Sequence, residues 1–173
     1  IIRAVKKPSK IIEINYLTID MDVKGLPESR MDQPLIALST IPNISCTKNK
    51  IDQYTISNNV NNNIRILTCY RPIFSHANFL SALKSLIEND YLLIVDYDDH
   101  PSISKNKINL EFTLKCCHAV QTSNKYLANI IKEYNPEVYI FENNVNSINQ
   151  KRINKKDNNK IKVFFGALNR KKD

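Results

Sequence analysis

Short apolar runs alternate with segments of helical periodicity along this chain, and that alternation constrains its fold more than any other feature. The strand-like runs cover residues 11–17, 43–47, 64–70, 91–95, 119–121 and 138–141. Between them, apolar residues recur at helical spacing, as Phe79, Leu83 and Leu86 do. Strands that alternate with helices predict a parallel sheet with helices on both faces. We therefore expect residues 11–145 to form one α/β domain.

The starts of the predicted helices carry local signals. Proline suits a first helical turn because that turn leaves its amide donors unused, and capping residues accept hydrogen bonds from the same turn. The predicted helix starts are Pro34, Ser75, and either Thr122 or Ser123. A further helix is predicted over 107–116, whereas 49–63 is polar, rich in Asn and without periodicity, as a loop would be.

Composition excludes several classes of protein. No apolar run approaches the length of a transmembrane helix. The four cysteines, which show no C-x-x-C spacing, are expected to be reduced thiols of a cytosolic protein. A net charge of +8 suits nucleic acid, an anionic membrane surface or anionic substrates. Because no helix-turn-helix motif or aromatic interleaving accompanies the lysines, we predict no nucleic-acid partner.

The C-terminal residues predict the start of a second domain. Residues 146–160 are polar, charged and aperiodic, as in an interdomain linker. An apolar run at 161–165 then ends at Gly166 and is followed by a basic cluster. In α/β domains a strand, a glycine turn and nearby cations form a phosphate site. The candidate residues for this site are Gly166, Asn169, Arg170 and Lys171. We expect this second domain, 161–173, to be truncated.

Polar residues follow the predicted strands, where ligands of an open parallel sheet bind. These residues are Arg71, the segment 96–100, Ser123, Asn143 with Asn144, and Arg170. Gathered at one edge of the sheet, they would form a cleft. Ser123 alone is equally typical of a helix cap, and the paired asparagines are equally typical of a turn.

The segment Asp96-Tyr97-Asp98-Asp99-His100 concentrates the strongest local chemistry. Three carboxylates this close repel one another unless a cation, a hydrogen-bonded sugar or basic side chains offset them, which indicates a functional role. One hypothesis is a metal site, because an apolar strand followed by Asp-x-Asp resembles the Mn-binding motif of the GT-A class of glycosyltransferases. Another is a solvated acidic loop that caps a helix after Pro101.

Three segments, in their order and spacing, resemble the GT-B glycosyltransferases, specifically the bacterial group related to glycosyltransferase families 1 and 4. The segments are 95–101 (VDYDDHP), 118–145 (HAVQTS through YNPEV to ENNV) and 163–170 (VFFGALNR). The resemblance covers the chain from about Arg30 onward. It implies two Rossmann-like domains facing across a cleft: an acceptor-side domain, residues 1–145, and a donor-binding domain that begins after the linker.

The resemblance also implies roles for individual residues. Asp98, Asp99 and His100 fall where relatives place a His or Asp that contacts the transferred sugar and the acceptor. Arg170, with Lys171 or Lys172 behind it, matches the basic pair that such enzymes direct at the donor diphosphate. The turn at 142–145 stands where the first domain of relatives ends.

The implied function is transfer of a sugar from a nucleotide-sugar to a hydroxyl acceptor, such as a glycan, a lipid-linked sugar or a cell-surface polysaccharide. The nucleotide-sugar is a substrate, and no cofactor or metal is predicted. The resemblance suggests a cytoplasmic protein, with peripheral contact at the inner face of a membrane compatible with it. Because the donor domain is truncated, the 173-residue chain alone is expected to be inactive. The competing hypotheses are a GT-A-like enzyme that uses Asp96 and Asp98, and a non-catalytic Rossmann-like phosphate-binding module.

Overall fold

A computed structural model describes residues 10–18, 28–58, 62–74 and 76–142 of the chain. These residues form a six-stranded sheet in which all neighbouring strands are parallel, in the order β2-β1-β3-β4-β5-β6. The strands are β1 (Ile12–Thr18), β2 (Ile44–Lys50), β3 (Ile64–Tyr70), β4 (Tyr91–Asp96), β5 (Ala119–Thr122) and β6 (Val138–Ile140). This is the predicted α/β architecture, with a Rossmann-like sheet.

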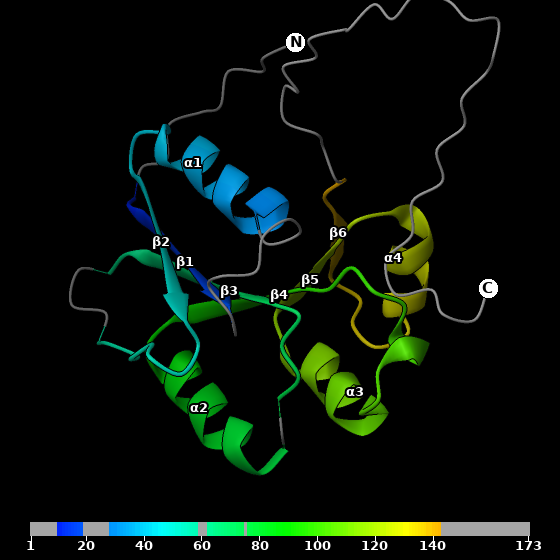
Figure 1. Ribbon diagram of the computed structural model, residues 1–173. Coiled ribbons are helices and arrows are strands. Elements are labelled where there is room, and N and C mark those ends of the chain that lie inside the picture. The colour runs from blue at the N-terminus through cyan, green and yellow to red at the C-terminus, as the bar shows by residue number, and fades with distance from the viewer. Residues whose placement is uncertain (1–9, 19–27, 59–61, 75, 143–173) are drawn as a thin grey trace, which may run out of the picture.

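Helices lie on both faces of the sheet (Figure 1). The helical elements are η1 (Glu28–Asp32), α1 (Gln33–Ser39), α2 (His76–Glu88), η2 (Pro101–Ile103), α3 (Lys107–Cys116) and α4 (Lys125–Ile131). Helix α1 lies on one face, and α2 and α3 lie on the other. None of the helices in the described part of the chain has both the length and the apolar character needed to span a membrane.

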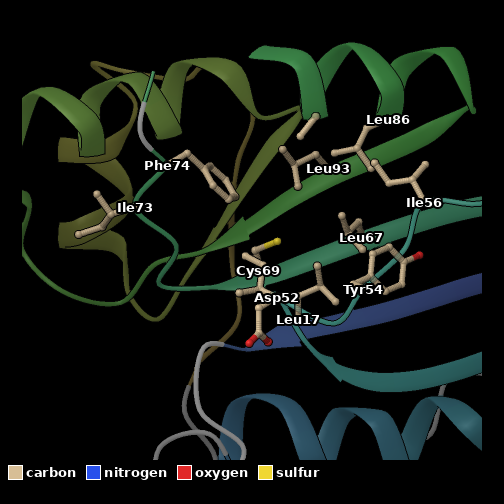
Figure 2. Close-up of a pocket in the computed structure, with 12 residues that line it drawn as sticks. Leu17, Asp52, Tyr54, Ile56, Leu67, Cys69, Ile73, Phe74, Leu86 and Leu93 are labelled. Atoms are coloured by element: carbon tan, nitrogen blue, oxygen red, sulfur yellow. The ribbon is translucent and has the colours of Figure 1, made fainter. Parts of the chain in front are cut away.

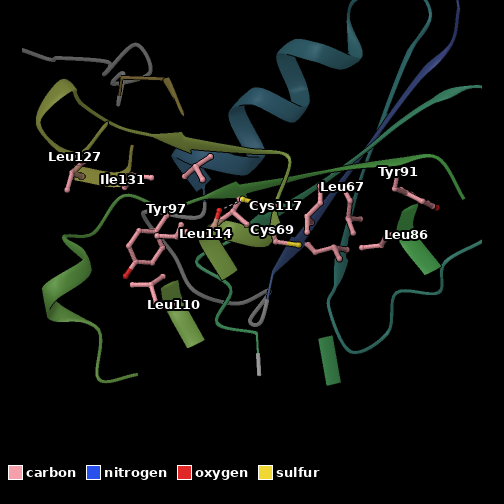
Figure 3. Packing of buried hydrophobic residues seen from close by; sticks show 14 residues of the cluster. Leu67, Cys69, Leu86, Tyr91, Tyr97, Leu110, Leu114, Cys117, Leu127 and Ile131 are labelled. Carbon is pink, nitrogen blue, oxygen red and sulfur yellow. Dashed lines mark hydrogen bonds between the residues drawn. The ribbon is translucent and has the colours of Figure 1, made fainter. Parts of the chain in front are cut away.

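The two faces have separate apolar cores because successive side chains of a strand point to opposite faces. On the α1 face, Ile14 and Tyr16 of β1 pack with Met31. The larger core lies on the other face and joins alternate residues of four strands to α2, α3 and α4 (Figure 3). Leu93 and Val95 lie at its centre and are fully buried. Asp96, the next residue along β4, therefore points toward the α1 face.

The strand order places a topological switch point between β1 and β3. From β1 the chain passes through α1 to β2 on one side, and then returns to pair β3 on the other side of β1. In an open parallel sheet, ligands bind in the crevice outside the carboxyl ends of the strands at such a point. The carboxyl end of β3 is followed directly by Arg71.

Most of the predicted elements are confirmed, and the differences have local causes. Strand β3 and helix α3 match their predicted bounds. Strand β2 continues to Lys50, beyond the predicted end at 47, because it stays in parallel register with β1 up to the pair Thr18 and Lys50. The predicted loop therefore begins at Ile51. Ser75, the linker at 146–160 and residues 161–173 lie outside the described residues.

The predicted cap of α4 is wrong. Neither Thr122 nor Ser123 caps this helix, because Thr122 completes β5 and Ser123 lies one residue too early. Asn124 is the cap, and its side-chain oxygen accepts a hydrogen bond from the backbone N–H of Leu127 at 2.9 Å. An Asn cap satisfies the same unpaired amide that a Ser or Thr cap would.

Candidate functional site

The carboxyl ends of β3 and β4 bring together three of the predicted site residues. Arg71 Nε donates to Asp98 Oδ1 at 2.6 Å, and Arg71 Nη2 donates to Asp99 Oδ1 at 3.1 Å. The backbone N–H of Arg71 donates to the carbonyl oxygen of Asp96 at 2.8 Å. The repulsion between the two carboxylates is thus offset by a guanidinium supplied from the neighbouring strand.

Arg71 adopts a backbone conformation that is uncommon for a residue with a side chain. Its φ angle is 46°, in the left-handed region, which costs a non-glycine residue on the order of 1–3 kcal/mol. The guanidinium also lies 5.2 Å from the ring centroid of Tyr70, close enough for a cation–π contact. The ion pairs and the ring contact together hold the side chain against the acidic loop despite this strain.

The two carboxylates differ in exposure. The Asp98 side chain is only 5 % exposed, whereas that of Asp99 is 43 % exposed. Asp99 and Arg71 line a cavity of about 320 Å³. The other residues on its wall are Ile73, Tyr97, Ile103, Ser104, Lys105 and Asn106. A ligand in this cavity would meet one accessible carboxylate, one guanidinium and one ammonium group.

A second arginine, which the sequence did not indicate, holds Asp96. Arg30 Nε donates to both carboxylate oxygens of Asp96, at 3.0 and 2.9 Å, and Nη2 donates at 2.5 Å. The side chains of Arg30 and Asp96 are 3 % and 1 % exposed, so this is a buried ion pair. Gln121 Nε2 donates to Asp96 at 3.4 Å, and Arg30 Nη1 reaches the carbonyl oxygen of Phe141 at 3.5 Å.

Burial sets the protonation behaviour around this pair. Burial raises the pKa of Asp96 to about 6, although Arg30 opposes that shift by stabilising the carboxylate. Near neutral pH the pair is therefore ionised. Burial, with the nearby charge of Asp98, raises the pKa of Tyr70 to about 12, so its hydroxyl stays protonated.

His100 lies apart from Arg71 although it follows Asp99 directly. Its Nδ1 accepts the backbone N–H of Ser102 at 3.1 Å and lies 2.7 Å from the Ser102 hydroxyl. The ring centroid lies 6.0 Å from that of Tyr126 in α4. His100 lines a different cavity, of about 330 Å³, with residues of α3 and α4 such as Glu111 and Ile130.

The tautomer of His100 follows from its partner. A backbone N–H can only donate, so the Nδ1 atom that accepts it carries no proton. The neutral ring must then hold its proton on Nε2 and can only donate there. In this arrangement His100 serves as a hydrogen-bond donor rather than as a base.

The remaining predicted site residues either follow a more distant strand or lie outside the described residues. Ser123 follows β5, which is two strands from β3 in the sheet, and its hydroxyl accepts from Asn124 Nδ2 at 3.2 Å. The other predicted cleft and donor-binding residues lie outside the described part of the chain; they are Asn143, Asn144, Gly166, Asn169, Arg170 and Lys171.

The geometry does not favour the metal hypothesis at Asp96 and Asp98. Both oxygens of Asp96 bind Arg30, and Asp98 binds Arg71. Across residues 10–18, 28–58, 62–74 and 76–142, no three His, Cys, Asp or Glu side chains gather as a metal site would require. A cation at Asp96 would first have to displace a bidentate guanidinium from a buried position.

No protein-family model, curated protein or solved structure matches this chain. Its function is therefore inferred from the residues at the carboxyl edge of the sheet.

Proposed function

We propose that this chain is the acceptor-side domain of a GT-B-like glycosyltransferase, which transfers a sugar from a nucleotide-sugar to a hydroxyl group. The observation that carries this proposal is the cluster of Arg71, Asp98 and Asp99 beside a cavity at the carboxyl edge of the sheet. Carboxylates and guanidinium groups can each form several hydrogen bonds with sugar hydroxyls. The ordered resemblance of the sequence segments supports the same class.

Asp99 is the residue we assign as the general base. Its carboxylate is the more exposed of the two and lines the cavity. It takes the proton of the acceptor hydroxyl while the acceptor oxygen bonds to the anomeric carbon of the donor. The bond between that carbon and the diphosphate oxygen breaks, and the nucleoside diphosphate leaves with the bonding electrons. A positioned base contributes roughly 100-fold or more to such a step.

Asp98 and His100 have supporting roles in this proposal. Asp98 is nearly buried and fixes the guanidinium of Arg71, so it orients the site rather than exchanging a proton. His100 lines the other cavity, and its N–H at Nε2 suits a hydrogen bond there to a more distant sugar oxygen or a phosphate oxygen. Arg170 and Lys171 are assigned to the negative charge that develops on the leaving diphosphate.

The test uses the whole product of the gene with UDP-glucose, UDP-galactose and GDP-mannose as donors and alkyl glycosides as acceptors. Release of nucleoside diphosphate is measured. We expect acceptor-dependent release, and a decrease in kcat of roughly 100-fold or more for Asp99→Asn. The matched control is Asp90→Asn, since Asp90 is an exposed aspartate at the opposite edge of the sheet, with a φ of 58° that Asn also adopts readily.

Two outcomes would contradict the proposal. Equal activity of Asp99→Asn and Asp90→Asn would remove Asp99 from the chemistry. Activity that is lost with a chelator and restored by Mn²⁺, but unchanged by Arg71→Ala, would favour the metal-dependent alternative at Asp96 and Asp98 instead.

A further inference from the structure

An apolar cavity of about 550 Å³ lies on the face of the sheet that carries α2 (Figure 2). It is bounded by β1, β3 and β4, by helix α2, and by the loop that follows β2. Where a helix usually covers the sheet between successive parallel strands, residues 51–58 cross this face as an irregular loop. The loop packs through Ile51, Tyr54 and Ile56 and leaves space beside α2.

The wall of this cavity is mainly apolar, and its one charged residue in the described part of the chain, Asp52, is exposed. Leu17, Leu67 and Leu93 form a buried base, and Tyr54 closes one side with its ring. The polar end of Tyr54 is already satisfied, because its hydroxyl lies 2.9 Å from that of Tyr91. Cys69 also remains apolar in character, since burial raises the pKa of its thiol to about 12.

The apolar cavity adjoins the cavity of the candidate site. Ile73 lines both of them. It is 46 % exposed, and Ile103, which also lines the polar cavity, is 70 % exposed. In Figure 2, Ile73 lies at one end of the group of lining residues, and Ile56 lies toward the other end. A ligand that extends past Ile73 would pass from Arg71 and Asp99 to a hydrocarbon-like surface.

We propose that the acceptor is amphipathic: its sugar lies at Arg71 and Asp99, and its single hydrocarbon chain lies in the apolar cavity. This inference rests on the proposed function and names the class of acceptor. The occupant is a hydrocarbon chain rather than a peptide, because peptide amides would lose their hydrogen bonds to water against leucine and isoleucine side chains. An unbranched or prenyl chain has no such groups.

The experiment compares binding of glucose, 1-octanol and octyl β-glucoside to the whole chain by isothermal titration calorimetry, below the critical micelle concentration. We expect octyl β-glucoside to bind about 100-fold more tightly than glucose, because burial of roughly three to four methylene groups suffices for that factor. It should also bind more tightly than 1-octanol. Arg71→Ala should then reduce the advantage of octyl β-glucoside over 1-octanol, since only the glucoside carries a sugar.

Two variants test the location of the hydrocarbon chain. Ala82→Phe fills the cavity from α2 and should remove at least nine-tenths of the octyl advantage while leaving glucose binding unchanged. Ile73→Asp places a charge where the two cavities meet and should have the same effect without altering the core, since Ile73 is half exposed. Ile108→Asp is the matched control, because Ile108 is an exposed isoleucine on α3 outside the residues that line either cavity.

The outcomes separate this inference from the proposed function. If octyl β-glucoside binds no more tightly than glucose while Arg71→Ala still weakens glucose binding, the sugar site stands and the hydrocarbon inference is overturned. If 1-octanol binds as tightly as octyl β-glucoside and Arg71→Ala changes neither, the cavity holds a chain but the sugar assignment fails. An octyl advantage that survives both Ala82→Phe and Ile73→Asp would place the chain elsewhere and overturn the inference.

Discussion

Replacing Arg30 with methionine should destabilise the fold far more than removing an exposed charge. The change leaves the carboxylate of Asp96 at 1 % exposure without the three guanidinium contacts of 2.5 to 3.0 Å. Removing one partner of a buried pair costs about 3–5 kcal/mol, because the other charge stays in a low-dielectric environment. That is a large part of the roughly 5–15 kcal/mol by which a domain is folded.

Urea denaturation followed by circular dichroism at pH 7.5 measures this cost. With a slope of about 1–3 kcal/mol per molar urea, the midpoint should fall by roughly 2 M. Lys84→Met is the control, since it removes an exposed pair with Glu88 at 3.7 Å that contributes at most about 0.5 kcal/mol. The double variant Arg30→Met with Asp96→Leu should recover most of the loss, because it removes both charges and fills the space with apolar atoms.

A small loss of stability in Arg30→Met would refute the buried ion pair. If Arg30→Met lowers the free energy of unfolding by less than about 1 kcal/mol with an unchanged slope, Asp96 is not held in a buried ion pair. The cost should also be smaller at pH 5, where Asp96 is protonated because its pKa is raised to about 6. An equal cost at pH 5 and pH 7.5 would mean that the lost interaction is packing rather than charge.

Changes at other buried or helix-capping residues should also alter the free energy of unfolding. Because the pKa of Asp96 is raised by burial, the folded state takes up its proton before the unfolded state does, so the contribution of Asp96 to stability grows as pH falls from about 7 to 4. Urea denaturation gives the free energy of unfolding of wild type and of Asp96→Asn at each pH. The difference, wild type minus Asp96→Asn, should grow by on the order of 3 kcal/mol as pH falls to 4. Asn135→Ala should cost about 2–4 kcal/mol in the same assay, since the buried amide donates to the carbonyls of Leu114 and Cys117 at 2.9 Å. Asn124→Ala should cost about 1 kcal/mol as a lost helix cap and Ser123→Ala almost nothing; equal costs would contradict the cap assignment.

The sheet could be predicted because the apolar residue pattern of its strands is itself typical of β-structure. Strand β4 is a continuous apolar run, as expected of a strand covered on one or both faces, and β3 ends where Arg71 and Pro72 interrupt the apolar pattern. The bounds of β2 could not be predicted, since residues 48–50 are polar and became strand only by pairing with β1. At an edge of the sheet, such polar residues can face solvent while the backbone pairs on one side.

The site was predicted in part, for a related reason. The rule that ligands bind beyond strand ends was sufficient to group Arg71 with Asp98 and Asp99, which the structure brings into contact. Arg30 was missed because its role depends on the distance between η1 and β4 in space, 66 residues apart in the chain. The only available signal was that Asp96 ends a buried strand and so needed a cation, but nothing in the sequence indicated which one.

His100 and Asp99 are adjacent in the sequence but line different cavities. It was grouped with Asp99 because the two residues are consecutive, and the resemblance assigned them one role. The chain turns at Pro101 into η2, where the ring accepts the backbone N–H of Ser102 and faces α3 and α4. Pro101 and the capping side chain of His100 favour this turn. The imidazole of His100 therefore lines a different cavity from the carboxylate of Asp99.

The two arginines act on the same stretch of backbone from different sides. Arg30 holds the side chain of Asp96, and the backbone N–H of Arg71 holds the carbonyl of that same residue at 2.8 Å. The side chain of Arg71 then holds Asp98 and Asp99 farther along the loop. Because these contacts link the buried pair to the Asp99 carboxylate, we expect a change at Arg30 to alter the cavity under conditions in which the sheet is still folded. In Arg30→Lys, which keeps the charge but loses the bidentate contact, sugar binding should weaken at temperatures where circular dichroism still shows a folded domain.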